Sequence, residues 1–406
     1  MTLYQPQKIY LERKAQNFPT TERILAHCPH TPVEIIDEVK PWIRKLREMR
    51  DPIGEGKRVL FLAYDKGQSF KPFPESESYF SCDYHTLHVA EGCDLECSYC
   101  ILQAYLTNPF LTIFVNIEEM LAKLQKGLEA HSTHFFRIGT GQLADSLSLD
   151  HLTGFSRILI PFFAKQKNAV LELKTKSTNI DHLLDLTPRG KTIVSWSMNS
   201  EKIQREEEHK CASIEARIKA AHRICGAQDY RIGFHFDPIM DYEGWENDYA
   251  EVIRKIFTNL SKDRIAWISL GCLRMLPDLK PIMQERFPKS PLAGAEWIRD
   301  MDGKKRYFKP RRIEIYKTMV AHIRRWAPEV TLYLSMESAE VWKQIFGYEA
   351  TRESVCALLD QAGTPKGGSD REIKGTPKGG SDREIKGTPK GGSNREIRGM
   401  RPVLAS

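Results

Sequence analysis

The stretch EGCDLECSYC, residues 91–100, places Cys93, Cys97 and Cys100 in a C-x3-C-x2-C spacing directly after a strand-like apolar run. Three thiolates this close together on one loop can hold three corners of a [4Fe–4S] cube. No fourth cysteine follows on the loop. The fourth iron would therefore stay open to a small-molecule ligand, as the free position of a catalytic metal site does.

The alternative for this triplet is a structural zinc ion with His85 or His88 as its fourth ligand. Zinc loops usually show one close pair of ligands that is well separated from a second pair. One compact triplet fits that arrangement poorly, so the spacing favours the iron–sulfur cluster.

Outward from the loop, short apolar runs alternate with helical patterns, which is typical of parallel βαβ units. The predicted strands are 84–89, 133–138, 169–175, 191–197, 230–236, 264–270 and 330–335. The predicted helices are 98–107, 117–129, 150–166, 212–226, 245–258 and 310–326. Polar or unusual residues follow several strands, at Gly139–Gln142, Lys176, Asn199, Asp237 and Cys272. In a parallel barrel these strand ends meet on one face, where chemistry is placed.

The rest of the chain divides around this region. Residues 1–80 are predicted to form an N-terminal α/β extension that packs on the barrel, with a helix near 32–49 and a strand at 58–64. The barrel is predicted to span residues 81–345, and a C-terminal helix residues 346–362.

Residues 363–398 are three near-copies of the unit GTPKGGSDREIK. Each copy has one isoleucine as its only sizeable apolar side chain, so burial cannot offset the entropy of ordering, and we predict a disordered tail over 363–406. The tail has ten basic and five acidic residues, a net +5 of the whole chain's +7, which leaves only +2 for residues 1–362. The repeat is either a neutral expansion or a weak nucleic-acid tether.

The composition excludes several classes of protein. With 406 residues and 41% hydrophobic content, the chain can bury a sizeable core. It has no run of about 18 apolar residues, so no transmembrane helix is expected. Its first residues lack the apolar region of a signal peptide, so we expect a cytoplasmic protein. Nine cysteines are too few for a disulfide scaffold in a chain of this length.

The cysteine loop resembles that of the radical S-adenosylmethionine (SAM) superfamily, and the extended string CSYCILQAYLTNP, 97–109, resembles its spore photoproduct lyase-like, DNA-repair branch. The likeness covers roughly residues 55–345. It continues through TKST 175–178, SMNS 197–200, GF-x3-PI 233–239, EGW 243–245, SLGCLR 269–274 and YLSMES 333–338. The resemblance implies an α/β fold with a partial (β/α)6 TIM-type barrel. It also implies SAM bound at the open iron and cleaved reductively to a 5′-deoxyadenosyl radical.

The resemblance also implies roles for residues at the strand ends. Tyr99 matches an aromatic residue near the SAM adenine, and Gly139, Gly141 and Gln142 resemble the segment that holds the SAM amino group. Lys176, with Lys174 as its fallback, matches the lysine that reaches the SAM carboxylate. The remaining matches are Ser197, Asn199 and Asp237, as polar contacts of SAM. Each position also has an ordinary structural interpretation, such as a turn or strand-end polarity.

The chain departs from the lyase pattern at its hydrogen donors. The cysteine that returns a hydrogen atom to the thymine radical in the family corresponds to Gln142 here, and a nearby serine corresponds to Ala144. The tyrosine after the third cluster cysteine is Ile101. Cys272 is either a substitute donor or a small buried core residue.

The segment DGKKRYFKPRR, 302–312, matches a region of the family that faces DNA. Its cations can attract phosphates and its aromatic rings can stack on bases. The alternative is a solvated basic turn at a helix start. The predicted DNA contacts are Lys304, Lys305, Arg306, Tyr307, Arg311 and Arg312.

Three functions remain open at this stage. The first is a radical SAM enzyme that acts on a pyrimidine lesion in DNA, with an electron donor such as flavodoxin or ferredoxin. The second has the same architecture but a small-molecule or peptide substrate, which the missing donor favours. The third is a cluster-containing sensor without turnover, against which the retained SAM-pocket residues argue.

Overall fold

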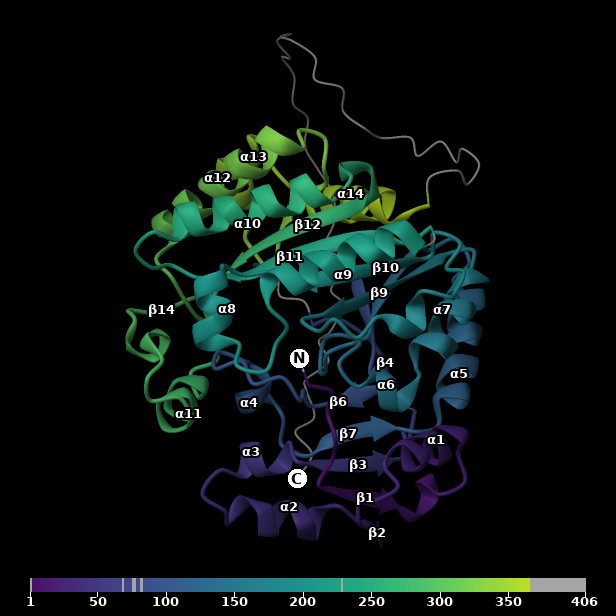
Figure 1. Cartoon of the computed structure of the whole chain (residues 1–406). Coiled ribbons are helices and arrows are strands. Elements are labelled where there is room, and N and C mark those ends of the chain that lie inside the picture. Colours follow the sequence, from purple (N-terminus) through teal and green to yellow (C-terminus); the bar gives the residue numbers. More distant parts are fainter. Residues whose placement is uncertain (1, 68, 75–77, 81–82, 228, 366–406) are drawn as a thin grey trace, which may run out of the picture. The chain divides into compact units, whose positions relative to one another are not determined.

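The computed structural model describes residues 2–67, 69–74, 78–80, 83–227 and 229–365, drawn in colour in Figure 1. Its largest sheet has eight strands in the order β16-β12-β11-β10-β9-β8-β5-β4. All neighbours from β16 to β5 are parallel, and β4 is an antiparallel edge strand. The strands are β4 (Phe70–Pro72), β5 (Tyr84–Leu87), β8 (Phe136–Gly139), β9 (Ala169–Thr175), β10 (Thr192–Ser197), β11 (Arg231–Ile239), β12 (Ile265–Cys272) and β16 (Leu332–Leu334).

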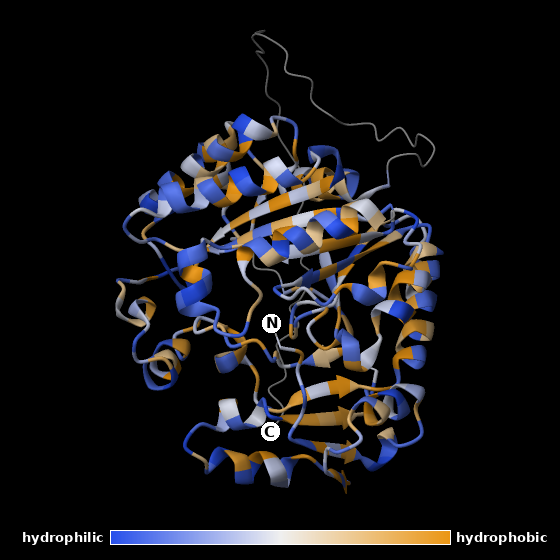
Figure 2. Ribbon diagram, viewed as in Figure 1, coloured by the Kyte–Doolittle hydropathy of each residue, from blue (hydrophilic) through white to orange (hydrophobic). Residues whose placement is uncertain are grey.

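The parallel strands are apolar along nearly their whole length because both faces of the sheet are covered. Every residue of β10 and β12 is buried, and Trp196, Phe234 and Phe236 are fully enclosed. Figure 2 shows these strands mostly in orange, whereas the helices that run along them are striped. This is the curled α/β half-barrel that the sequence predicts.

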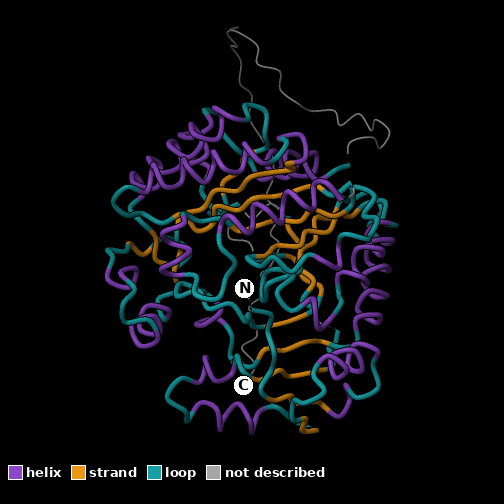
Figure 3. The backbone as a smooth tube through the Cα atoms, in the orientation of Figure 1, coloured by secondary structure: helices purple, strands orange, loops and turns teal. Residues whose placement is uncertain are grey.

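The helices return the chain between parallel strands, as Figure 3 shows. Their apolar residues recur at helical spacing and face the sheet; α10, for example, buries Trp245, Tyr249, Val252, Ile253 and Ile256. The helices from the barrel onward are α4 (Leu102–Tyr105), α5 (Ile117–Ala130), α6 (Asp150–Thr153), α7 (Ser156–Ala164), α8 (Glu201–Glu207), α9 (Ile214–Ala227), α10 (Trp245–Asn259), α11 (Leu279–Arg286), α12 (Lys309–Trp326), α13 (Ala339–Phe346) and α14 (Arg352–Gly363).

A second sheet joins the N-terminal part to the barrel region. Its order is β2-β1-β3-β7-β6, so strands from both sides of the expected boundary at residue 80 complete one sheet. Residues 1–366 form one compact unit. The strands are β1 (Lys8–Glu12), β2 (Val33–Ile36), β3 (Val59–Ala63), β6 (Ala90–Glu91) and β7 (Leu111–Phe114), with helices α1 (Pro19–His27), α2 (Lys40–Arg47) and α3 (Pro52–Gly56).

A third, three-stranded sheet precedes α12. It consists of β13 (Arg274–Met275), β14 (Ile298–Arg299) and β15 (Lys305–Arg306) in the antiparallel order β13-β15-β14.

Several predicted elements differ from the structure. The helix expected near 32–49 is wrong in its first part, because Val33–Ile36 pairs with β1 as a strand and only Lys40–Arg47 is helical. The helix expected at 150–166 is interrupted at Gly154, whose φ of +61° ends α6. The helix expected at 98–107 shrinks to Leu102–Tyr105 because the cysteine loop occupies its first half.

The C-terminal helix expected at 346–362 is α14, Arg352–Gly363. Residues 366–406, which hold nearly all of the repeat tail, lie outside the described residues. Within the described part of the chain, none of the helices combines the length and the apolar character needed to span a membrane.

Candidate functional site

The three cysteines lie on the loop between β6 and α4, beyond the carboxyl end of β5 (Figure 1). Gln103, on the short helix α4, donates its side-chain amide to the carbonyl oxygens of Cys97 and Ser98, at 3.2 and 2.9 Å. From the other side the backbone N–H of Ser98 donates to the carbonyl of Glu207 at 2.9 Å. The loop is thus held in place from two sides.

Cations lie beside the thiols. The Lys57 ammonium pairs with Glu96 at 2.8 Å, and the Lys57 side chain is 10% exposed. Burial would lower the pKa of Lys57, but Glu96 and the neighbouring thiols of Cys100 and Cys93 outweigh it and raise that pKa. Burial raises the pKa of Cys93 and Cys100, and Lys57 opposes this rise. A cation in this position favours thiolates, which are the form that binds iron.

A fourth cysteine, which no sequence pattern predicts here, lies beside the loop. The sulfur of Cys211 is 3.5 Å from the sulfur of Cys97. This hydrogen bond, together with Lys176, lowers the pKa of Cys97 although the thiol is buried. Cys211 also lines a cavity of about 430 Å³ with Lys57 and Asp94.

Glu208 brings together three of the predicted SAM-contacting residues, Tyr99, Lys176 and Asn199, next to Cys97. Its buried carboxylate accepts hydrogen bonds from the hydroxyl of Tyr99 and from the guanidinium of Arg217. The ammonium of Lys176 lies 3.5 Å from the same carboxylate and donates to the Tyr99 hydroxyl at 3.2 Å. The amide of Asn199 reaches it at 3.5 Å.

The charges around Glu208 do not cancel. Burial alone would raise the pKa of Glu208, but Arg217 and then Lys176 lower it to about 2, so the group is ionised. Two cations therefore face one carboxylate, which leaves one positive charge next to Cys97. That surplus suits a thiolate or a ligand carboxylate.

Asp145 positions the lysine. Its carboxylate accepts from the backbone N–H groups of Leu147, Ser148 and Lys176 at 2.9, 2.8 and 2.8 Å, and from the Thr175 hydroxyl at 2.6 Å. These bonds tie the loop after β8 to the end of β9. The Ser148 hydroxyl then donates to Asp94 of the cysteine loop at 2.5 Å.

The two predicted glycines have packing reasons that the sequence does not reveal. A Cβ at Gly139 would lie 1.7 Å from the hydroxyl of Tyr84, so the close approach of Tyr84 requires glycine at this position. A Cβ at Gly141 would meet Lys174 and Ser146 at 3.0 Å. The role of Gly139 beside SAM stays a prediction, and a ligand there would have to approach its backbone from a side that Tyr84 does not occupy.

Gln142 and Asp237 are both engaged elsewhere. The Gln142 carbonyl oxygen lies 2.9 Å from Nε2 of His88. Asp237 forms a bidentate ion pair with Arg274, at 2.8 and 2.9 Å. Burial would raise the pKa of Asp237, but Arg274 and Lys174 lower it to about 2. Contact with SAM would require either side chain to exchange these partners.

Ser197 ends β10 at the same edge as Asn199, and its carbonyl oxygen accepts from Arg217 at 2.8 Å. His85 and His88, the zinc alternatives, have their contacts away from the cysteines. His88 bonds to Thr86 and Gln142, and His85 packs on Phe70.

Cys272 is 1% exposed at the end of β12. Its backbone N–H donates to the hydroxyl of Tyr316 at 2.9 Å, and burial raises the pKa of its thiol. The side chain belongs to the main hydrophobic core. This environment matches the buried-core interpretation of Cys272.

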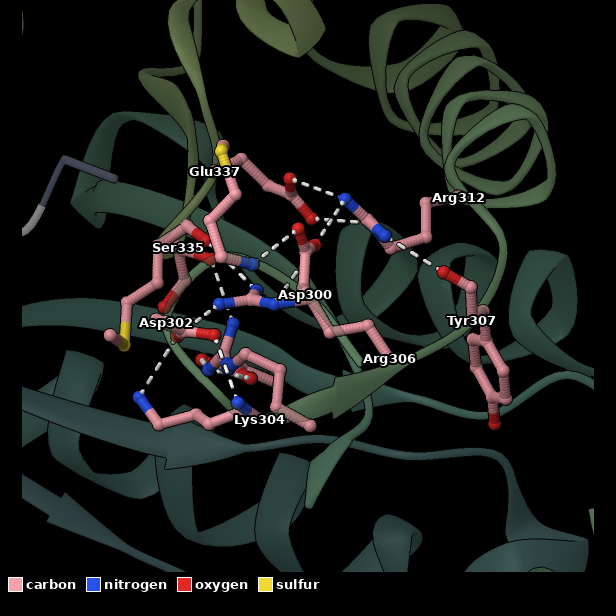
Figure 4. Close-up of polar contacts among 12 residues, drawn as sticks. Asp300, Asp302, Lys304, Arg306, Tyr307, Arg312, Ser335 and Glu337 are labelled. Atoms are coloured by element: carbon pink, nitrogen blue, oxygen red, sulfur yellow. Dashed lines mark hydrogen bonds and ion pairs between the residues drawn. The ribbon is translucent and has the colours of Figure 1, made fainter. Parts of the chain in front are cut away.

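Figure 4 shows that the basic segment is largely paired within the protein. Arg312 is buried and donates to Glu337 at 3.0 Å and to the carbonyl of Tyr307 at 2.7 Å. Arg306 is fully buried, bonds to Asp302 at 2.5 Å and lies 4.3 Å from the ring centre of Tyr79. Both guanidiniums are buried, so contact of Arg306 or Arg312 with DNA would require them to leave these partners.

The other members of this segment differ in exposure. Lys304 pairs with Asp302 at 3.3 Å, and Arg311 pairs with Asp241 at 2.8 Å. Tyr307 is 6% exposed and stacks on Trp297 with 4.9 Å between ring centres, so its ring is not open to a base. Lys305 is half-buried, and Phe308 is exposed.

Sequence reasoning missed Glu208, Arg217 and Cys211. Glu208 ends a run of three glutamates in a helical pattern, which is typical of a solvated face. Nothing local marks it as a buried partner of Lys176. It also missed Glu172, whose buried carboxylate inside the barrel accepts from Tyr84, Ser195, His235 and Trp267.

The three cysteines can hold an iron–sulfur cluster on chemical grounds. They offer three thiols on one constrained loop, with Lys57 and Lys176 nearby to offset the negative charge of thiolates. The surplus cation at Lys176 fits a ligand that carries a carboxylate.

The family model for spore photoproduct lyase matches residues 4–334. Spore photoproduct lyase of Geobacillus sp. (strain Y412MC61) is 26% identical over 344 residues, which cover 81% of this chain and 98% of the relative. The enzyme of Bacillus subtilis (strain 168) is 26% identical over 314 residues, covering 75% and 86%.

Solved structures agree in fold. Spore photoproduct lyase complexed with dinucleoside spore photoproduct matches with a TM-score of 0.73 at 23% identity, over 82% of this chain and 100% of that one. The family match spans most of the chain and includes the cysteine loop, the Glu208 cluster and every strand of the barrel sheet. The chain therefore belongs to the spore photoproduct lyase family.

Proposed function

We propose that this protein is a radical SAM lyase that repairs a pyrimidine lesion in DNA, of the kind represented by dinucleoside spore photoproduct. Its cofactors are a [4Fe–4S] cluster and SAM. The observation that carries the proposal is the loop of Cys93, Cys97 and Cys100, which lies at the carboxyl end of a parallel barrel within the segment matched by the family.

When bound, the cluster and SAM supply a 5′-deoxyadenosyl radical that removes a hydrogen atom from the substrate. The chain's own residues bind, orient and exclude water. Cys93, Cys97 and Cys100 would hold the cluster. Lys176, fixed by Asp145 through its backbone, would face the SAM carboxylate with the positive charge that Glu208 leaves uncompensated.

The other SAM contacts are proposals of the same kind. Tyr99 and Asn199 are supported by their convergence on Glu208 beside Cys97. Ser197 is supported by its position at the end of β10, next to Arg217. Gln142 and Asp237 would have to exchange their present partners on binding. Gly139 and Gly141 are proposed to offer backbone to the SAM amino group, and Lys174 is the alternative to Lys176.

The activity is tested by reconstituting the cluster without oxygen and adding SAM and a reductant. We expect 5′-deoxyadenosine, and with dinucleoside spore photoproduct or ultraviolet-irradiated thymine-rich DNA we expect thymine to be restored. The triple variant with Cys93, Cys97 and Cys100 changed to Ala should do neither. Formation of 5′-deoxyadenosine without restored thymine would point to a different substrate. If no 5′-deoxyadenosine forms, the radical mechanism is contradicted.

The hydrogen donor is a separate question because Gln142 and Ile101 stand where the family has a thiol and a phenol. Cys272 is the substitute proposed from the sequence. Turnover and product should be unchanged in Cys272→Ala if the thiol is only a core residue, as its burial favours. A loss of restored thymine with continued 5′-deoxyadenosine formation would identify it as the donor. Flavodoxin or ferredoxin is the proposed source of electrons.

A further inference from the structure

A group of metal-binding side chains lies at the end of the barrel opposite the cysteine loop. Asp83 immediately precedes β5, and His85 is the second residue of that strand. His134 lies two residues before β8, the parallel neighbour of β5. The cysteine loop comes after the carboxyl end of β5, whereas this group lies at the amino ends of β5 and β8, so the two groups are separate.

The three side chains converge on one point. Nε2 of His134 lies 2.9 Å from one carboxylate oxygen of Asp83, and Nδ1 of His85 lies 3.8 Å from the other. One ligand atom from each residue lies within 4.8 Å of the others. Two imidazoles and one carboxylate are the donor set of open zinc sites and of several other transition-metal sites.

The two imidazoles are held by packing. The ring of His85 stacks on Phe70 with 5.3 Å between centres and meets the edge of Phe136 at 5.1 Å. The ring of His134 lies 4.4 Å from Phe136. Such support limits the rotamers of metal ligands and lowers the entropy lost on binding.

The backbone around the group is also constrained. The side chain of Asn168 donates to the carbonyl oxygens of Leu128, His131 and His134, each at 3.1 Å, which fixes the loop before β8. Asp83 has a φ of +53°, a left-handed conformation that costs energy in a residue with a side chain. In this conformation the Asp83 carboxylate lies within 4 Å of one nitrogen of each ring.

The local charge and exposure suit a cation. Arg137 of β8 is neutralised by Asp360 of α14 at 2.7 Å, so the carboxylate of Asp83 supplies the local negative charge. Asp83 and His134 have side chains 41 and 42% exposed, and His85 is 12% exposed. An ion can therefore enter from solvent and keep a water in its remaining position.

We propose that Asp83, His85 and His134 bind one divalent transition-metal ion, with zinc as the representative, at the amino end of β5 and β8. To bind the ion, Nδ1 of His85 must carry no proton. Binding therefore selects the tautomer in which Nδ1 no longer donates to the carbonyl oxygen of Asp83, 3.2 Å away. The ion joins the start of β5 to the loop before β8 and has a structural role.

The test uses the full-length protein with its cluster in place, kept without oxygen and equilibrated against micromolar zinc. We expect one zinc per chain by elemental analysis after dialysis. X-ray absorption at the zinc edge should show only nitrogen and oxygen ligands near 2.0–2.1 Å. Sulfur scattering near 2.3 Å would place the zinc on cysteines and would overturn the proposal.

Variants locate the ion. Asp83→Asn keeps the shape and tolerates the left-handed backbone but loses the charge, and His134→Asn removes one imidazole. Each should weaken zinc binding by at least about 100-fold, because loss of even an outer partner costs about 10–100-fold. His131→Asn is the matched control, since this exposed histidine belongs to the same loop but bonds to the carbonyl of Gly127.

The melting temperature in zinc supplies a second readout. Zinc should raise it in the unchanged protein and in His131→Asn, but not in Asp83→Asn or His134→Asn. Equal zinc binding in all four proteins, or no zinc in the unchanged protein, would contradict the site.

Discussion

Among single residues, Glu208 has a central place in the site because it pairs with the two buried cations, Arg217 and Lys176. Its carboxylate faces Arg217 and Lys176 with no solvent access, and removal of a buried counter-charge leaves cations without compensation. A carboxyl group with a lowered pKa stabilises the fold above its unfolded pKa, near 4.3, and this contribution disappears as the pH falls toward 2.

Glu208→Gln should therefore lower the free energy of unfolding by roughly 3–5 kcal/mol at neutral pH. The difference from the unchanged protein should shrink as the pH falls below about 4, because the unfolded chain then binds a proton at Glu208 that the folded chain, with a pKa of about 2, does not yet bind. Denaturant titrations without oxygen at several pH values measure both effects. Glu206→Gln is the control, since Glu206 forms a surface ion pair with Arg205 at 3.7 Å. Equal destabilisation by the two variants would contradict this role.

The short distance between Cys211 and Cys97 leads to a second prediction at the residue scale. In cluster-free protein, hydrogen peroxide should join Cys97 and Cys211, because their sulfurs must close only from 3.5 Å to about 2.05 Å. The two thiols lose two electrons and two protons, and the peroxide becomes two waters. Mass spectrometry should find the linked peptides. After the same peroxide treatment, the Cys211→Ser variant should still take up the cluster, because Cys97 then has no thiol partner at position 211. The control variant Cys225→Ser, changed in α9, should lose cluster uptake after peroxide as the unchanged protein does. Absence of the linked peptides would refute the prediction.

At the scale of elements, β15 and the start of α12 form an internal ion-pair network rather than a binding surface. The carboxylates of Asp300, Asp302 and Glu337 accept from the buried guanidiniums of Arg306 and Arg312. These contacts join the three-stranded sheet to the chain after β16.

Arg312→Gln should thus destabilise the fold by roughly 3–5 kcal/mol, because Glu337 would stay buried without its partner. Lys305→Gln should change stability by less than about 0.5 kcal/mol. If Lys305 contacts a phosphate, this variant should reduce the salt slope of DNA binding by about 1. Thermal unfolding and DNA titrations at several salt concentrations separate the two effects. The reverse pattern would restore the DNA-facing interpretation of Arg312.

At the scale of the whole molecule, residues 1–366 form one compact unit that contains all the described elements. The cysteine loop, the Glu208 cluster and the ends of the barrel strands all belong to it. The repeats contribute most of the chain's net charge but little apolar surface.

A chain that ends at Lys366 should keep the melting temperature of the full protein, the cluster content and the yield of 5′-deoxyadenosine. Its DNA affinity and salt dependence should also be unchanged, because we propose that the repeat is a neutral expansion. The truncation is best made after Lys366, since Asp360 pairs with Arg137 and Thr364 accepts from Arg231. A weaker affinity with a smaller salt slope would support the tether instead.

The sequence by itself determined the alternation of strands and helices, the ligand triplet and the family. These features depend on residues that are close together in the sequence. Apolar periodicity predicts which face of an element is buried, and three thiols within eight residues can be recognised without knowing any distant partner. The position of Lys176 at a strand end also followed from this pattern.

Only the tertiary structure decided which polar groups meet. Glu208 lies near Tyr99 across more than 100 residues of chain, and Tyr84 fills the space beside Gly139 from another strand. Arg306 and Arg312 resemble a basic surface in sequence but are buried by partners drawn from distant segments. Side-chain type states what a residue can do, whereas burial and pairing depend on register and packing between remote segments, which no local pattern encodes.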